Sequence, residues 1–399
     1  MFSSLKVKNF RIYWFGMFVS LVGTWIQAVA LSWLVFELTH SAFLLGLVGF
    51  LTYIPIFLLS LFGGVLADRM NKRSILICTQ TTFMLLAFLL AALTQMKLIT
   101  PLHVMMIAVL NGIVMAFDAP SRQAMVVELV GKENLFNAIA LNSVAFNSSR
   151  VIGPAFAGIL VAAIGMSGCF YINGISFLAL IFALLIIKIK NNHRTNKNNK
   201  ALRDLKDGVV FIKNDPSILV LISMVSVISL FGVGYIILMP IFANDILGVG
   251  ARGLGFLMSS AGIGALAGGL FLAHLGDFKY KGKLLAVSSF IFSLSLLLFA
   301  LSKSYIVSIL ALLCMGYASV SVIALINTIL QTKVDDQFRG RVMSVFMLAF
   351  IGIIPFGNLI AGTLAQILGV SPALVISGCI STLFFLAINI LFPGIRKIA

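Results

Sequence analysis

The sequence is dominated by long apolar runs that contain no Asp, Glu, Lys or Arg. Four of these runs are residues 12–36, 74–96, 217–244 and 304–332. Each is at least as long as the roughly 20 residues with which a helix crosses a bilayer, whereas barrel strands are short and alternate polar with apolar positions. The pattern therefore predicts an all-α integral membrane protein.

The polar residues between the runs predict twelve transmembrane helices. We place them at residues 12–37, 42–66, 74–96, 101–125, 138–164, 168–188, 217–243, 253–276, 284–302, 305–330, 342–368 and 372–392. Gly369 and Pro372 interrupt the last two, as helix breakers do. One long polar stretch, with an amphipathic segment at 201–212, divides the chain into six helices and six helices. The predicted domains are an N-terminal bundle (1–189), a cytoplasmic central loop (190–216) and a C-terminal bundle (217–399).

The two halves repeat each other weakly. Glycines of the fifth helix recur 204 residues later, and the entry of the second helix recurs 209 residues later. The first set pairs Gly153, Gly158 and Gly165 with Gly357, Gly362 and Gly369, and the second pairs residues 45–47 with 254–256. Duplicated halves are typical of transporters that bind their substrate at the bilayer midplane. We therefore expect two pseudo-symmetric six-helix bundles and a transport function, not an enzyme.

Composition and charge support this class. Apolar residues make up 61% and charged residues 10% of the chain, against about 25% charged residues in soluble domains. With the N-terminus in the cytoplasm, the predicted cytoplasmic segments carry 23 Lys and Arg and the external loops three. This asymmetry predicts that both termini are cytoplasmic, and it explains the net charge of +16 without a nucleic-acid partner.

The residues typical of other chemistries are missing from the sequence. The four cysteines lie in apolar runs without metal-ligand spacing, and no Walker loop, serine elbow, HExxH or haem pattern occurs. We therefore expect no metal, no cofactor and no ATP hydrolysis.

The loop between the second and third helices carries a family resemblance. Residues 64–73 include Gly64, Asp68, Arg69, Lys72 and Arg73. This pattern resembles the signature loop of the major facilitator superfamily. The resemblance implies a latch that closes the cytoplasmic side, in which Asp68 faces the N-terminal end of helix 11 and Arg69 pairs with an acid of helix 4. A solvated turn that only fixes topology is the alternative.

Five local patterns narrow the resemblance to one branch. They are residues 9–11, 33–41, 117–123, 147–154 and 339–344. Together they resemble bacterial drug, macrolide and catecholate-siderophore exporters, the enterobactin-exporter-like group. This implies proton-driven export of a small amphipathic molecule by a monomer in the bacterial cytoplasmic (inner) membrane, with membrane lipids as the other partner. A lysophospholipid flippase on the same fold, or a transport-inactive sensor, are alternatives.

Charges inside predicted helices are the best site candidates, because an intramembrane charge is costly. Asp118 and Arg122 are four residues apart and share a helix face. Asp118, the acid well inside helix 4, is our expected partner for Arg69 and a candidate proton carrier. Arg150 could bind an anionic substrate group, couple to a titrating carboxylate, or pair statically with Asp118. Glu37 is a weaker proton candidate, with a cap at the membrane edge as the alternative.

Two further sets complete the predicted site. Gln27 is a candidate cavity residue, because helix 1 lines the cavity in the family. Gly153, Pro154 and Gly158 in helix 5 would let helices approach closely and bend. They resemble the glycine-rich signature of antiporters, and a simple packing kink is the alternative. Abundant Phe and Met would form an adaptable apolar cavity that fits amphipathic substrates.

Overall fold

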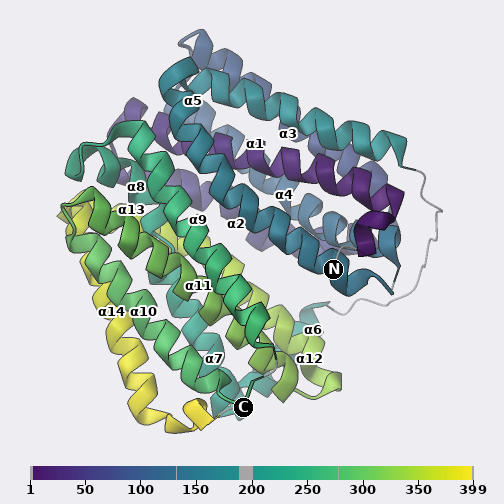
Figure 1. Ribbon diagram of the computed structural model, residues 1–399, viewed down its shortest axis with the longest axis vertical. Helices are drawn as coiled ribbons and strands as arrows, with labels where there is room; N and C mark the ends of the chain where they lie inside the picture. The colour runs from purple at the N-terminus through teal and green to yellow at the C-terminus, as the bar shows by residue number, and fades with distance from the viewer. Residues whose placement is uncertain (1–2, 132, 188–200, 277, 398–399) are drawn as a thin grey trace. The chain divides into compact units, whose positions relative to one another are not determined.

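The computed structural model describes residues 3–131, 133–187, 201–276 and 278–397 (Figure 1). Within these ranges the side chains of Leu61, Asp68, residues 201–206 and Lys397 lie outside the description. Every regular element in the described ranges is a helix. The predicted all-α class is therefore confirmed.

The helices follow one another along the chain with short connections. In order they are η1 (Ser3–Lys6), α1 (Lys8–Thr39), α2 (Ala42–Arg69), α3 (Lys72–Gln95), α4 (Pro101–Val130), α5 (Leu135–Ile186), α6 (Ala201–Asn214), α7 (Pro216–Val227), η2 (Ile228–Gly232), α8 (Tyr235–Ile241), η3 (Phe242–Ile246), α9 (Gly250–Leu275), α10 (Lys281–Leu301), α11 (Tyr305–Lys333), α12 (Asp336–Met347), η4 (Leu348–Gly352), α13 (Ile354–Leu368), α14 (Val370–Leu391) and η5 (Pro393–Lys397). The segments η1 and η5 are 3₁₀-helices, and η2, η3 and η4 are π-helices.

Eleven helical segments in the described ranges are long and apolar enough to cross a membrane. One of them, α5, has 52 residues and contains two spans, because the backbone leaves the helical region at Gly165, where φ is 74°. The segments therefore correspond to the twelve predicted spans. The last break differs from its prediction. The chain turns at Gly369 (φ 92°), and Pro372 lies in the first turn of α14, where proline is tolerated.

The seventh and eleventh spans are interrupted, although the apolar pattern predicts continuous helices there. The π-helix η2 interrupts the seventh span, and η4 interrupts the eleventh. A Cβ atom on Gly357 of α13 would lie 2.6 Å from the backbone oxygens of both Ser229 and Leu230 in η2. The two spans thus approach each other at backbone distance where η2 departs from α-helical geometry. Periodicity alone gives no sign of such π-segments, which occur mostly as short interruptions.

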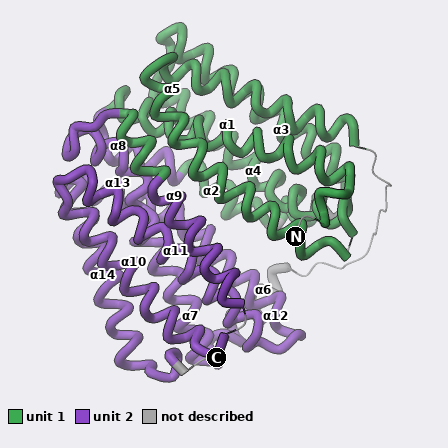
Figure 2. Tube along the Cα trace, in the orientation of Figure 1, with its two compact units in different colours: residues 1–39, 51–199, 251–259 green, residues 40–50, 200–250, 260–399 purple. Residues whose placement is uncertain are grey.

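The helices group into two compact units (Figure 2). Unit 1 comprises residues 1–39, 51–199 and 251–259, and unit 2 comprises residues 40–50, 200–250 and 260–399. In unit 1, α5 packs against α1 and α3, and α3 packs against α4. In unit 2, α10 packs against α11 and α14, and α6 packs against α12. The predicted domain boundaries at 189/190 and 216/217 stay a prediction.

The sequence repeat has a structural counterpart inside each unit. In unit 1 a Cβ on Gly112 would lie 2.3 Å from the carbonyl oxygen of Thr52. In unit 2 a Cβ on Gly316 would lie 2.0 Å from the carbonyl oxygen of Ala261. These glycines are 204 residues apart and their partners 209 apart, which are the spacings of the sequence repeat. Both units therefore contain the same close helix crossing.

Candidate functional site

A buried carboxylate lies in unit 1. Asp118 of α4 is 1% exposed. It accepts hydrogen bonds from Thr79 Oγ1 and Gln80 Nε2, each 2.7 Å long, and forms an ion pair with Nε of Arg122. A buried charge is tolerated when it is paired and hydrogen-bonded in this way. The arrangement therefore holds Asp118 as a fully partnered carboxylate within a membrane span.

Three helices supply this cluster, which we call the Asp118 cluster (Tyr13, Ser20, Thr79, Gln80, Asp118 and Arg122). Arg122 follows Asp118 by one turn of α4, and Thr79 and Gln80 are adjacent on α3. From α1, Ser20 donates a 3.4 Å hydrogen bond to Oε1 of Gln80. The sequence prediction found only the two charged members. The adjacent polar pair Thr79-Gln80 inside an apolar run was the signal that it missed.

The Asp118 cluster also contains unused donors. The hydroxyl of Tyr13 and Nη1 of Arg122 are buried without a hydrogen-bond partner among the described residues. Tyr13 lies close enough to interact electrostatically with both Arg122 and Asp118. Unsatisfied buried donors are rare and each costs free energy. The cluster can therefore gain bonds if its members rearrange.

The predicted pairing of Asp118 with Arg69 is wrong in this structure. The partner of Asp118 is Arg122, from the same helix, and Arg69 is exposed at the end of α2. The static pairing of Arg150 with Asp118, one of three roles considered for Arg150, is wrong for the same reason. An arginine one turn away can reach the carboxylate without ordering a second helix, which explains why the local partner is preferred.

Lys72 and Arg73, which belong to the predicted latch, lie at the start of α3 and contact other helices of unit 1. Asn71 caps this helix by accepting from the backbone N–H of Arg73 at 3.0 Å. Lys72 forms a 2.8 Å ion pair with Glu128 near the end of α4, with side chains 14% and 29% exposed. Arg73 donates a 2.8 Å hydrogen bond to the carbonyl of Leu185. Glu128 is therefore ion-paired, although its side chain is partly exposed.

The two neighbouring glycines near the end of α2 have different surroundings. A Cβ on Gly64 would meet no atom within 4 Å. A Cβ on the neighbouring Gly63 would lie 2.0 Å from the carbonyl oxygen of Ala116 in α4. Gly63 therefore allows the close approach of α2 and α4, a role that the sequence motif alone did not reveal. The side chain of Asp68 lies outside the description.

Arg150 occupies the middle of the first span of α5. It is half-buried, and its one interaction within the described ranges is electrostatic, with Tyr53 of α2. It makes no ion pair there, unlike Arg122. Tyr53 was not predicted, since a single tyrosine in an apolar run carries no distinguishing pattern.

The remaining predicted residues have local partners. Gln27 accepts a 2.8 Å hydrogen bond from Nδ2 of Asn173, which lies in the second span of α5. Glu37 is exposed at the end of α1 and accepts a 2.5 Å hydrogen bond from Nε1 of Trp33. Neither residue belongs to the Asp118 cluster.

The predicted packing residues of α5 contact two helices. A Cβ on Gly153 would lie 2.4 Å from Cβ of Trp25 in α1. A Cβ on Gly158 would lie 2.9 Å from the carbonyl oxygen of Arg252, at the start of α9. Pro154 lies inside α5, and the marked backbone departure occurs further on, at Gly165.

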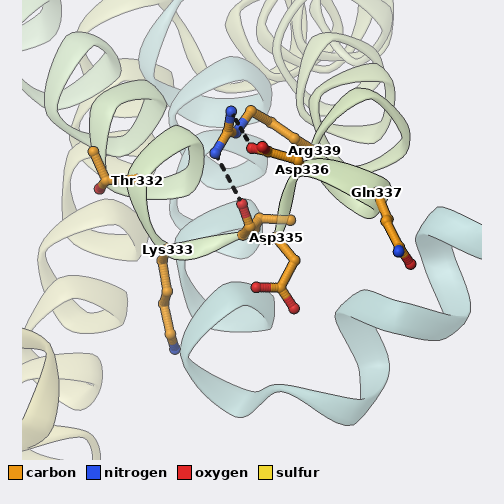
Figure 3. A pocket seen from close by; sticks show the side chains of 7 residues that line it. Thr332, Lys333, Asp335, Asp336, Gln337 and Arg339 are labelled. Atoms are coloured by element: carbon orange, nitrogen blue, oxygen red, sulfur yellow. Dashed lines mark hydrogen bonds and ion pairs between the residues drawn. The ribbon is translucent and has the colours of Figure 1, made fainter.

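A polar pocket of about 520 Å³ lies in unit 2 (Figure 3). Its lining runs from Thr332 to Asp336 and includes Gln337 and Arg339. Arg339 points toward Asp336 and pairs with it at 2.6 Å. Lys333 pairs at 3.0 Å with Asp215, the N-cap of α7. The pocket joins helix ends by ion pairs, which engage Lys333, Asp336 and Arg339.

The carboxyl group of Asp215 has a lowered pKa. Burial acts to raise the pKa, but hydrogen bonds from Lys333 and from the backbone N–H groups of Ile218 and Ser217 outweigh it. Asp215 is therefore held in its charged form at the start of α7. No group of three His, Cys, Asp or Glu among the described residues could hold a metal ion.

Comparison with solved structures supports the fold. A bacterial homolog of the human lysosomal transporter Spinster superposes with a TM-score of 0.75 at 14% identity, covering 98% of each chain. This fold, together with the family match and the relatives given in the next paragraph, identifies the chain as a multi-pass secondary transporter of the major facilitator superfamily, not an enzyme.

The family is narrower than the superfamily. Residues 1–397 match the family described as transmembrane secretion effector, and the chain belongs to it. The staphyloferrin A transporter of Staphylococcus aureus is 27% identical, over 94% of this chain and 95% of the relative. Macrolide efflux protein A of Streptococcus pyogenes is 21% identical, over 100% and 98%. The predicted resemblance to an exporter branch is thereby confirmed.

Proposed function

We propose that this protein exports a small amphipathic molecule of the siderophore or drug class in exchange for protons. Two similar proteins are named for staphyloferrin A transport and macrolide efflux, which supports this substrate range. The basic residues of the predicted loops support a cytoplasmic-membrane location with both termini inside. We propose further that it works as a monomer, in which the halves 1–189 and 217–399 alternate around the loop 190–216.

The Asp118 cluster carries this proposal, because proton coupling needs a titratable group inside the membrane. Among the described residues Asp118 is the buried carboxylate, and it contacts α3 directly and α1 through Gln80. A carboxylate in such a position is a functional-site hypothesis by default. Because Asp118 is paired with Arg122, its charged and protonated forms would favour different packing of the surrounding helices.

Protonation of Asp118 would remove the charge that balances Arg122. Arginine stays protonated in proteins, so Arg122 cannot compensate by losing its own proton. Removing one charge of a buried ion pair costs about 3–5 kcal/mol. This cost favours a rearrangement in which Arg122 finds new partners. Tyr13 and Nη1 of Arg122 have free hydrogen-bonding capacity for it. Proton uptake would thereby change the packing of α1, α3 and α4.

The α2–α3 connection remains our proposed latch, with Gly64, Asp68, Arg69, Lys72 and Arg73. The ion pair from Lys72 to Glu128 supports it, since this contact ties the connection to the end of α4, three turns from Asp118. A change in the packing of α4 would reach the connection through this pair. Gln27 and Glu37 are retained as a proposed cavity amide and a secondary proton site.

The test is proton-driven uptake into everted bacterial membrane vesicles, with erythromycin and a catecholate siderophore as probes. We expect one probe to accumulate under an acid-inside gradient and nigericin to abolish its accumulation. The double variant Asp118→Asn with Arg122→Gln removes the titratable group without leaving a lone buried charge. It should bind the probe but lose accumulation against its gradient. Glu133→Gln, at an exposed acid, is the control. Wild-type accumulation by the double variant would refute the role of Asp118.

A further inference from the structure

A positive charge without an ion-pair partner among the described residues lies midway along the first span of α5. Arg150 is midway between Leu135, where α5 begins, and Gly165, where its first span ends. At 1.5 Å per residue it is about 22 Å along the helix from each end. That distance exceeds the half-thickness of the hydrocarbon layer, about 15 Å, so the head groups of both leaflets are distant. The guanidinium therefore needs a partner inside the membrane.

The protein does not supply a carboxylate for Arg150 within the described ranges. Helix α5 contains no Asp or Glu. The buried acid of the unit, Asp118, is paired with Arg122, and Glu128 is paired with Lys72. Arg150 stays charged, and an unpaired charge inside a bilayer is costly. Since Arg150 is only half-buried, a ligand can reach it.

Tyr53 of α2 is near enough to Arg150 for an electrostatic interaction, and both side chains are half-buried. The hydroxyl of Tyr53 has no hydrogen-bond partner in the part of the chain that the structure describes. A guanidinium presents a planar fork that binds a carboxylate through two parallel hydrogen bonds. A phenol can add a third donor to the same anion.

The surroundings of Arg150 are aromatic. Phe146, Arg150 and Gly153 share one face of α5, because they are four and three residues apart. Phe146 is 48% exposed and meets Trp25 of α1 edge to face, with ring centroids 6.1 Å apart. Gly153 also packs on Trp25, so this face of α5 is directed toward α1. An apolar, aromatic surface thus adjoins the charged fork.

We infer that Arg150 and Tyr53 form a substrate subsite for the carboxylate of an amphipathic anion, whose apolar part packs against Phe146 and Trp25. This inference rests on the proposed export function and specifies the substrate class. It predicts that carboxylate-bearing molecules are preferred over uncharged molecules of the same shape and over cations, which Arg150 repels.

The experiment uses purified full-length protein and ¹⁹F NMR binding of three matched probes. These are 6-fluoro-2-naphthoate, its uncharged amide, and the corresponding naphthylmethylammonium cation. We expect wild-type protein to bind the carboxylate at least about tenfold more tightly than the amide, as hydrogen bonds to a charged group imply. Arg150→Gln should abolish this preference, Arg150→Lys should keep part of it, and Tyr53→Phe should reduce it several-fold.

Arg252→Gln is the matched control, because Arg252 is exposed at the start of α9. It should bind all three probes as wild-type protein does. Unchanged carboxylate preference in a folded Arg150→Gln protein would overturn the inference, and so would equal binding of carboxylate and amide by the wild type. Arg150-dependent binding of lysophosphatidylglycerol without naphthoate binding would also overturn it, in favour of a lipid phosphate. Binding is measured without a proton gradient. The binding result can therefore be interpreted even if the protein does not show proton-driven export.

Discussion

The ion pair of Asp118 and Arg122 predicts an asymmetric response to neutralising its members one at a time. The side chains are 1% and 19% exposed, so neither charge is screened well by solvent. Asp118→Asn leaves a lone guanidinium that cannot lose its proton. We expect it to lower the free energy of unfolding by about 3–5 kcal/mol, at every pH at which the protein is folded.

Arg122→Gln should be less harmful. The carboxylate of Asp118 keeps two hydrogen bonds of 2.7 Å, from Thr79 and Gln80. We expect a loss of about 1–3 kcal/mol. The loss in the double variant should be smaller than the sum of the single losses by a coupling energy of about 2–3 kcal/mol, the upper part of the range for contacting residues.

The assay is reversible unfolding in mixed micelles, with the free energy obtained by linear extrapolation. Asp245→Asn is the control, because Asp245 is exposed at the end of the seventh span. Strictly additive single and double losses, or an Asp118→Asn protein within 1 kcal/mol of the control, would refute the reasoning from the ion pair.

Two further predictions concern neighbouring regions. Gly63→Ala should destabilise the protein by about 1–3 kcal/mol through overpacking, because its Cβ would lie 2.0 Å from a carbonyl oxygen. Gly64→Ala places its Cβ in open space and should stabilise the protein by about 0.5–1 kcal/mol. Equal effects of the two variants in thermal melts would contradict this prediction. Asp215→Asn keeps the helix cap but loses the ion pair with Lys333. Each of the two side chains in this pair is about one-third exposed. Its cost, about 0.5 kcal/mol, should be complete above the ordinary pKa of 3.8 and vanish as the pH falls through the lowered folded pKa; a loss that grows on acidification would be inconsistent with it.

The twelve spans were predictable because each requires only a long apolar run. The breaks inside spans were not, because they depend on tertiary contacts: at η2 the backbone meets Gly357, more than a hundred positions away in the sequence. The sequence placed Pro372 between helices, but the first turn of α14 accommodates it.

The charged residues of the site were predictable for a similar reason, since charge is rare in apolar runs. Their partners were not. Family resemblance pointed Asp118 toward Arg69, while the structure pairs it with the nearer Arg122. Thr79 and Gln80 form an adjacent polar pair in an apolar run, whereas Tyr53 carries no distinguishing pattern and becomes visible only in the folded structure.

The repeat explains two orphan hydroxyls in unit 2. The 209-residue spacing relates Ser20 to Ser229 and Thr79 to Ser288, and the 204-residue spacing relates Asp118 to Val322. Ser229 and Ser288 are buried without hydrogen-bond partners among the described residues, whereas their counterparts Ser20 and Thr79 are bonded to Gln80 and Asp118. Ser288→Ala should therefore leave stability unchanged or raise it by about 1 kcal/mol, whereas Thr79→Val should lower it by about 1.5–3 kcal/mol by removing a bond to a charged acceptor. Unfolding in mixed micelles measures both, and comparable losses would show that the second unit retains a working copy of the cluster.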